Sequence, residues 1–74
     1  MDRQIYDYSE LLGDIKKVFG AQSAFARAMG MAESTLSLKL NNKAEWSQDE
    51  MTLAVKLLNA ETYKVRPYFF TRKV

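Results

Sequence analysis

The chain has 74 residues, 47 % of them hydrophobic, so it can form one compact domain with a single core. It contains no cysteine and no histidine, which excludes a disulfide framework, a thiolate zinc site and histidine-based acid–base chemistry. We therefore expect neither an enzyme nor a protein with a metal or another cofactor. No apolar run approaches the ~20 residues of a membrane span, and the polar start at Met1–Gln4 leads into no signal segment, so a cytoplasmic protein is expected.

The net charge of +2 is low for a nucleic-acid-binding protein, and its distribution is more informative than its total. Residues 22–43 carry a net charge of +2 and residues 61–74 carry +3. Residues 1–21 carry −1 and residues 44–60 carry −2. Positive charge is therefore concentrated in the central segment and in the tail.

The first half of the chain predicts three short amphipathic helices. The first is expected to run from an N-cap at Ser9 to Gly20, with an apolar stripe formed by Leu11, Leu12, Ile15, Val18 and Phe19. The second and third are expected over residues 22–29 and 33–40. Only Gly30–Ala32 separates them, and glycine suits the left-handed position at a helix C-terminus. This spacing predicts a tight helix-turn-helix.

A fourth helix is predicted after Trp46, because Ser47 and Glu50 form a capping-box pattern. It should end near Asn59, with a core face formed by Met51, Ala54, Val55 and Leu58. The other residues expected in the core are Phe25, Met29, Met31, Leu36, Leu40 and Trp46, with Tyr6 and Tyr8 as lids over it.

The segment 61–74 has the least regular pattern in the chain. Pro67 is expected to break any helix there, and Tyr68–Phe70 shows no helical spacing. A short helix followed by an extended aromatic segment is predicted. The three aromatic residues either close the core beneath Trp46, which we favour, or form a dimer interface.

The stretch 22–42, QSAFARAMGMAESTLSLKLNN, resembles the helix-turn-helix of lambda-repressor-like and Cro-like proteins. The shared features are Gln22 at the start of the second helix, an alanine four residues later, Gly30 in the turn, and Leu36 and Leu40 in the third helix. The resemblance extends over about residues 8–60. It implies an all-α domain of four to five short helices, and we expect residues 1–74 to form this one domain. The whole chain is most similar to small Cro-like regulators of temperate phages of Gram-positive bacteria, some of which modulate or antagonise the immunity repressor.

A helical wheel places Leu36 and Leu40 on the buried face of the third helix. In the family that the chain resembles, the opposite face enters the major groove of operator DNA. The resemblance implies base contacts from Glu33, Ser34, Thr35, Ser37 and Leu38, of which the two serines could bond to phosphate instead. It implies phosphate contacts from Gln22, Lys39, Asn41, Asn42 and Lys43. The alternative is that these polar residues are ordinary solvated side chains.

Three features depart from a strong DNA-binding helix. Ala21 and Ala32 stand where the family usually has a capping serine or threonine. Glu33 would bring a negative charge towards a polyanion, and Leu38 is a large apolar side chain on a face that we expect to be exposed to solvent.

The first hypothesis is a Cro-like regulator that binds operator DNA, as a homodimer, to control the choice between lysogeny and lysis. The alternative is a modulator that uses the same surface to bind the DNA-binding domain of the cognate phage repressor.

Overall fold

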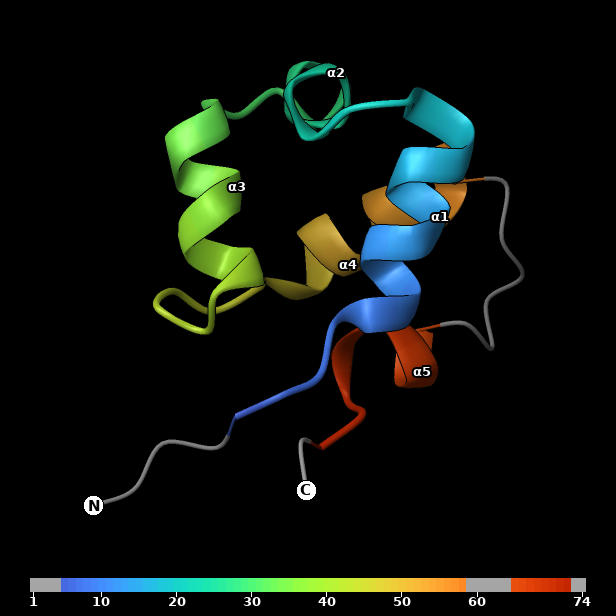
Figure 1. Cartoon of the computed structure of the whole chain (residues 1–74). Helices are drawn as coiled ribbons and strands as arrows, with labels where there is room; N and C mark the ends of the chain where they lie inside the picture. Colours follow the sequence, from blue (N-terminus) through green and yellow to red (C-terminus); the bar gives the residue numbers. More distant parts are fainter. Residues whose placement is uncertain (1–4, 59–64, 73–74) are drawn as a thin grey trace.

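The computed structural model describes residues 5–58 and 65–72, and the helices in this part of the chain form an all-α fold (Figure 1). The helices are α1 (Ser9–Phe19), α2 (Gln22–Met29), α3 (Glu33–Leu40), α4 (Gln48–Leu57) and α5 (Val65–Phe69). The predicted fold class is thereby confirmed. No helix within the described residues is both long enough and apolar enough to cross a membrane.

The start of α1 differs from the prediction. Ser9 is the first residue of the helix and not its N-cap, which is Tyr8. Asp7 takes over the capping role, because its carboxylate accepts a hydrogen bond from the Ser9 backbone N–H at 2.9 Å. The helix ends at Gly20, whose φ of 84° is readily adopted only by glycine.

The turn between α2 and α3 has the predicted form. Gly30 adopts the left-handed conformation with φ 75°, and its N–H and that of Met31 bond back to the last turn of α2. The two N-cap residues, Ala21 and Ala32, make no side-chain capping hydrogen bond. Both helices therefore begin with backbone N–H groups that no capping side chain satisfies.

The start of α4 confirms the predicted capping box. The Ser47 hydroxyl accepts from the Glu50 N–H at 3.1 Å, and the Glu50 carboxylate accepts from the Ser47 N–H at 2.9 Å. The helix runs to Leu57 with Leu58 as its C-cap. The predicted end at Asn59 lies outside the described residues.

Pro67 does not break the last helix, contrary to the prediction. It is the third residue of α5, within the first turn, where a backbone N–H has no acceptor inside the helix and its loss costs little. After α5 the chain is extended, and Arg72 forms an isolated antiparallel bridge with Tyr6. The predictions for residues 61–64 and 73–74 lie outside the described residues.

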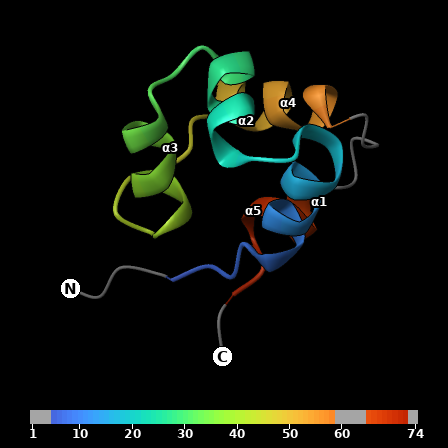
Figure 2. The same ribbon diagram turned by 45° about the horizontal axis from the view of Figure 1, so that its top comes forward.

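All five helices contribute residues to the core, and α3 packs on α2 at the edge of the molecule (Figures 1 and 2). Two expectations need correction, because Val18 and Phe70 are about half exposed, at 45 % and 46 %. Tyr68 and Phe69 are fully buried and close the core, with the Phe69 ring 4.9 Å from that of Trp46. The buried residues are Tyr8, Leu11, Ile15, Phe25, Ala26, Met29, Leu36, Leu40, Trp46, Ala54, Val55, Leu58, Tyr68 and Phe69. The two lids and Met31 also fit the prediction, since Tyr6 and Met31 are partly buried against this core.

Candidate partner-binding surface

The outward side of α3 is the candidate binding surface. In both views α3 stands at the edge of the molecule, with α2 between it and α1 (Figures 1 and 2). Leu36 and Leu40 face inward, as the helical wheel predicted. We define the α3 surface by the exposed residues Glu33, Ser34, Thr35, Leu38 and Asn41. Leu38 is its large apolar group, and 47 % of that residue is exposed.

Lys39 does not belong to this surface, and the prediction that it contacts phosphate needs correction. Only 9 % of the residue is exposed. Its Nζ lies 3.0 Å from the Glu50 carboxylate and donates to the Glu45 carbonyl oxygen at 2.7 Å. The ammonium also lies 5.9 Å from the centre of the Trp46 ring. Lys39 therefore ties α3 to the start of α4 and is not available to a polyanion.

Asn42 also has an internal role in place of the predicted phosphate contact. Its side-chain oxygen accepts from the Tyr6 N–H at 2.9 Å, and its Nδ2 donates to the Tyr6 carbonyl at 3.0 Å. Its φ of 61° places it in the left-handed region, which asparagine tolerates better than most residues. The side chain thus joins the loop after α3 to the N-terminal segment.

The remaining predicted site residues fall into two groups. Asn41 donates from Nδ2 to the Ser37 carbonyl at 2.8 Å and to the Ser37 hydroxyl at 3.3 Å, so these two side chains partly satisfy each other. Gln22 and Lys43 are exposed, at the start of α2 and in the loop after α3. Gln22 lies on α2 and Lys43 in the loop after α3, so neither belongs to the α3 surface as defined above.

The charge of the α3 surface follows from this arrangement. The helix carries two charged residues, Glu33 and Lys39. Glu33 is exposed, whereas Lys39 is buried against Glu50. The outward side of α3 therefore presents one negative charge, two hydroxyl groups and an exposed leucine.

The ion pair that holds Lys39 has a measurable consequence for stability. Burial raises the pKa of Glu50, but the Ser47 N–H and the Lys39 ammonium lower it more, so its pKa lies below the ordinary value of 4.5. A carboxyl with a depressed pKa stabilises the fold above its unfolded-state pKa, and this contribution is lost as pH falls through the folded-state value.

We expect the Glu50→Gln variant to be less stable than the wild type by about 1 kcal/mol at neutral pH, because Lys39 loses its anionic partner. The difference should shrink as pH falls below about 4.5, the ordinary value for the carboxyl. Urea unfolding at several pH values measures it. Glu33→Gln is the control for losing an exposed carboxylate, and a Glu50→Gln difference that is constant with pH would contradict the proposed ion pair.

The comparisons with known proteins place this chain in a family. Residues 4–72 match the family described as Protein of unknown function (DUF739). The chain belongs to this family. Among solved structures, it is similar to the solution structure of the modulator of repression (MOR) of the temperate bacteriophage TP901-1 from Lactococcus lactis. The two sequences are 49 % identical, the match covers 93 % of each chain, and the TM-score is 0.79. No curated protein matches the chain.

These findings confirm part of what the sequence predicted about relatives. The expected similarity to a phage modulator of repression is present over nearly the whole length of this DUF739 chain. The wider resemblance of residues 22–42 to lambda-repressor-like and Cro-like proteins remains a prediction. So do the binding roles of Gln22 and of the residues on and around α3.

Proposed function

We propose that this protein modulates repression by binding the DNA-binding domain of the cognate phage repressor through the α3 surface. The similarity to the TP901-1 modulator of repression supports this role, because 49 % identity over 93 % of both chains includes the helices that form the surface. The proposal is the alternative of the two hypotheses that the sequence raised. It involves no catalysis and no cofactor.

The burial of Lys39 is the observation that carries the proposal. With its ammonium paired to Glu50, the outward side of α3 has no cation to offer a phosphate backbone, and Glu33 adds a negative charge. DNA binding draws most of its affinity from cations that neutralise phosphates. A weakly acidic surface with an exposed Leu38 suits a basic protein partner better than it suits DNA.

The chemistry of a repressor explains why such a surface would antagonise it. A repressor must present basic and polar groups to bind its operator. A modulator that covers those groups competes directly with DNA, so repression is relieved without any change in the operator. The uncapped starts of α2 and α3, at Ala21 and Ala32, fit this role because no capping hydroxyl is offered to a phosphate.

Reversing the charge of Glu33 separates the proposed function from operator binding. Glu33→Lys should lower the affinity for the repressor's DNA-binding domain about tenfold at low salt, because a favourable charge pair becomes a repulsive one. The loss should shrink as salt rises. If α3 instead contacted operator DNA, the same variant would bind DNA more tightly. Calorimetric titration with the repressor domain and gel-shift titration with operator DNA measure the two affinities.

Asp49→Lys is the matched control for this experiment. Both acidic residues are exposed in the first turn of a helix, so the cost of placing a cation there is similar. Asp49 lies on α4 and is not one of the residues of the α3 surface, so its variant should retain nearly wild-type affinity. Equal losses in both variants would show that net charge, and not the α3 surface, governs binding.

A further inference from the structure

The C-terminal end of α3 is closed by a Schellman motif, in which the two residues after the C-cap donate their backbone N–H groups to the last turn of the helix. The Asn42 N–H donates to the Lys39 carbonyl at 3.3 Å, and the Lys43 N–H donates to the Leu38 carbonyl at 2.8 Å. Asn42 occupies the left-handed position of the motif, with a φ of 61°. Glycine is the usual residue at this position because it has no Cβ, so an asparagine there calls for a separate explanation.

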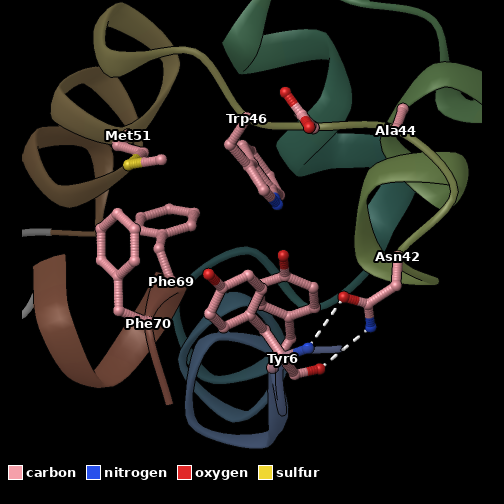
Figure 3. Close-up of a pocket in the computed structure, with 9 residues that line it drawn as sticks. Tyr6, Asn42, Ala44, Trp46, Met51, Phe69 and Phe70 are labelled. Carbon is pink, nitrogen blue, oxygen red and sulfur yellow. Dashed lines mark hydrogen bonds between the residues drawn. The ribbon is translucent and has the colours of Figure 1, made fainter. Parts of the chain in front are cut away.

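The Asn42 side chain provides that explanation, because its amide pairs with both backbone polar groups of Tyr6. Oδ1 accepts a hydrogen bond from the Tyr6 N–H at 2.9 Å, and Nδ2 donates one to the Tyr6 carbonyl at 3.0 Å (Figure 3). We call these two bonds the Asn42–Tyr6 pair. Both bonds are partly buried, and a glycine would leave the two Tyr6 groups without these partners. A pocket of about 250 Å³ lined by both residues borders the pair, so apolar packing around it is incomplete.

The Asn42–Tyr6 pair connects α3 to a segment that is itself held by the rest of the fold. The Asp7 N–H donates to the Thr71 carbonyl at 2.7 Å. Tyr6 lies opposite Arg72 in an antiparallel bridge. The N-terminal segment therefore lies between the end of α3 and the segment after α5, and it contacts both.

This connection matters because few other contacts hold the last turn of α3. Of the described helices, only α2 packs on α3. Leu40 anchors the last turn in the core, and Lys39 anchors it to the Glu50 carboxylate. The Asn42–Tyr6 pair adds the connection that follows this turn directly along the chain.

Two residues of the α3 surface, Leu38 and Asn41, lie at this end of the helix. The Leu38 carbonyl accepts the Lys43 N–H, so the backbone of Leu38 is part of the Schellman motif. The Asn41 N–H donates to the Ser37 carbonyl at 3.0 Å, and its Nδ2 donates to the same oxygen at 2.8 Å. If the end of α3 frays, a partner must reorder the turn that carries both side chains, and ordering a segment on binding lowers the affinity.

We propose that Asn42 is a positioning residue for the partner-binding surface. By pairing with Tyr6 it fixes the end of α3, and so holds Leu38 and Asn41 in the arrangement that the partner binds. This role rests on the proposed function, because the partner is taken to be the repressor's DNA-binding domain. It makes the N-terminal segment a support of the α3 surface, although no residue of that segment belongs to the surface.

Asn42→Gly tests this role, because glycine suits the left-handed backbone of the Schellman motif and the substitution removes only the amide. We expect its affinity for the repressor's DNA-binding domain to fall about tenfold, as measured by calorimetric titration at neutral pH. Tyr68→Phe is the control for a general loss of stability, since it removes the hydrogen bond from Tyr68 on α5 to Asp14 on α1. This control should retain wild-type affinity, and an equal loss in both variants would overturn the inference.

Asn42→Asp tests the two hydrogen bonds themselves through their dependence on pH. The introduced carboxylate accepts from the Tyr6 N–H but has no proton for the Tyr6 carbonyl, whereas the protonated carboxyl makes both bonds. Its pKa should therefore lie above the ordinary aspartate value of about 3.9. Because the folded-state pKa is raised, the pair forms at low pH and is lost as pH rises through that pKa.

The affinity of Asn42→Asp, divided by that of the wild type at the same pH, should rise from about one tenth at neutral pH to about one third or more near pH 4. Dividing by the wild type removes the titration of the carboxylates that both chains share, including Asp7 and Glu33. Asn42→Gly adds no titratable group, so its ratio should stay constant with pH.

A ratio for Asn42→Asp that does not change with pH would overturn the positioning role. Wild-type affinity in Asn42→Gly, with Leu38→Asp still weakened, would overturn it and leave the proposed function intact. Failure of the wild-type chain itself to bind the repressor domain would instead refute the proposed function, and the positioning role with it.

Discussion

Replacing Leu38 with aspartate should weaken binding to the repressor's DNA-binding domain by at least about thirtyfold. Leu38 is the large apolar side chain of the α3 surface and is 47 % exposed, so it is available to a partner. In a complex it would be desolvated at the centre of the contact, where a few side chains dominate affinity. Aspartate would place an uncompensated charge in that contact, and such charges are costly to bury.

The control for this variant is Leu53→Asp, which introduces the same charge on α4 at a leucine that is 36 % exposed. It should retain nearly wild-type affinity. Circular dichroism and thermal unfolding establish that both variants are folded, and calorimetric titration with the repressor domain measures binding. Unchanged affinity in Leu38→Asp would contradict the proposed surface, and an equal loss in both variants would point to a non-specific effect of charge.

Phe69→Ala should have the largest effect on stability, about 3–5 kcal/mol. The Phe69 side chain is 2 % exposed and its ring packs edge-to-face on Trp46 at 4.9 Å, so truncation removes buried apolar surface and leaves a cavity. A domain of this size is expected to have a total stability of only about 4–11 kcal/mol. The variant should therefore lose a large part of its stability, and urea unfolding at low temperature should measure the loss.

Phe70→Ala is a matched control, because it makes the same substitution one residue later. Phe70 is 46 % exposed and contacts Tyr6 edge-to-face, so its loss should cost no more than about 1 kcal/mol. A large difference between the two variants is the expected result. Similar losses would mean that Phe69 and Phe70 contribute equally to stability, and that the burial of Phe69 beneath Trp46 is not the main contribution.

The Lys39–Glu50 ion pair explains how the exposed side of α3 comes to carry only a negative charge. Among the described helices, α3 packs on α2, and the Lys39–Glu50 ion pair connects it to α4. Pairing Lys39 inside the fold positions the C-terminal half of α3 and removes its cation from the surface at the same time. Glu33, the two hydroxyl residues, Leu38 and Asn41 are left exposed on the α3 surface.

Local patterns in the sequence predicted most of the helices correctly, because the interactions that begin and end them are local. The bounds of α2 and α3 depend on apolar spacing and on Gly30, and the start of α4 depends on two residues three positions apart. The inward direction of Leu36 and Leu40 also follows from helical periodicity alone. The same reasoning placed Val18 in the apolar stripe of α1, but 45 % of that residue is exposed.

The structure of the C-terminal segment was harder to predict, because α5 depends on contacts with the rest of the fold. Pro67 discourages a helix in general, but α5 is only five residues long and holds the proline in its first turn. Tyr68 and Phe69 are buried against α1, α4 and Trp46, and Tyr68 donates a hydrogen bond to the Asp14 carboxylate, 54 residues earlier in the chain. The aromatic residues of the segment indicated closure of the core beneath Trp46, but nothing in the segment indicated the packing on α1 and α4 or the bond to Asp14.

The sequence by itself determined that this is a helical protein with a tight turn at Gly30 and with Leu38 on an outer face, because short-range spacing encodes each of these features. Only the tertiary structure decided which polar residues near α3 are available to a partner. Lys39 is paired with Glu50, eleven positions away, and Asn42 with Tyr6, 36 positions away. A lysine or an asparagine fits the local sequence pattern equally well whether its side chain is solvated or paired. Only the packing of distant segments therefore reveals that Lys39 and Asn42 are engaged inside the fold.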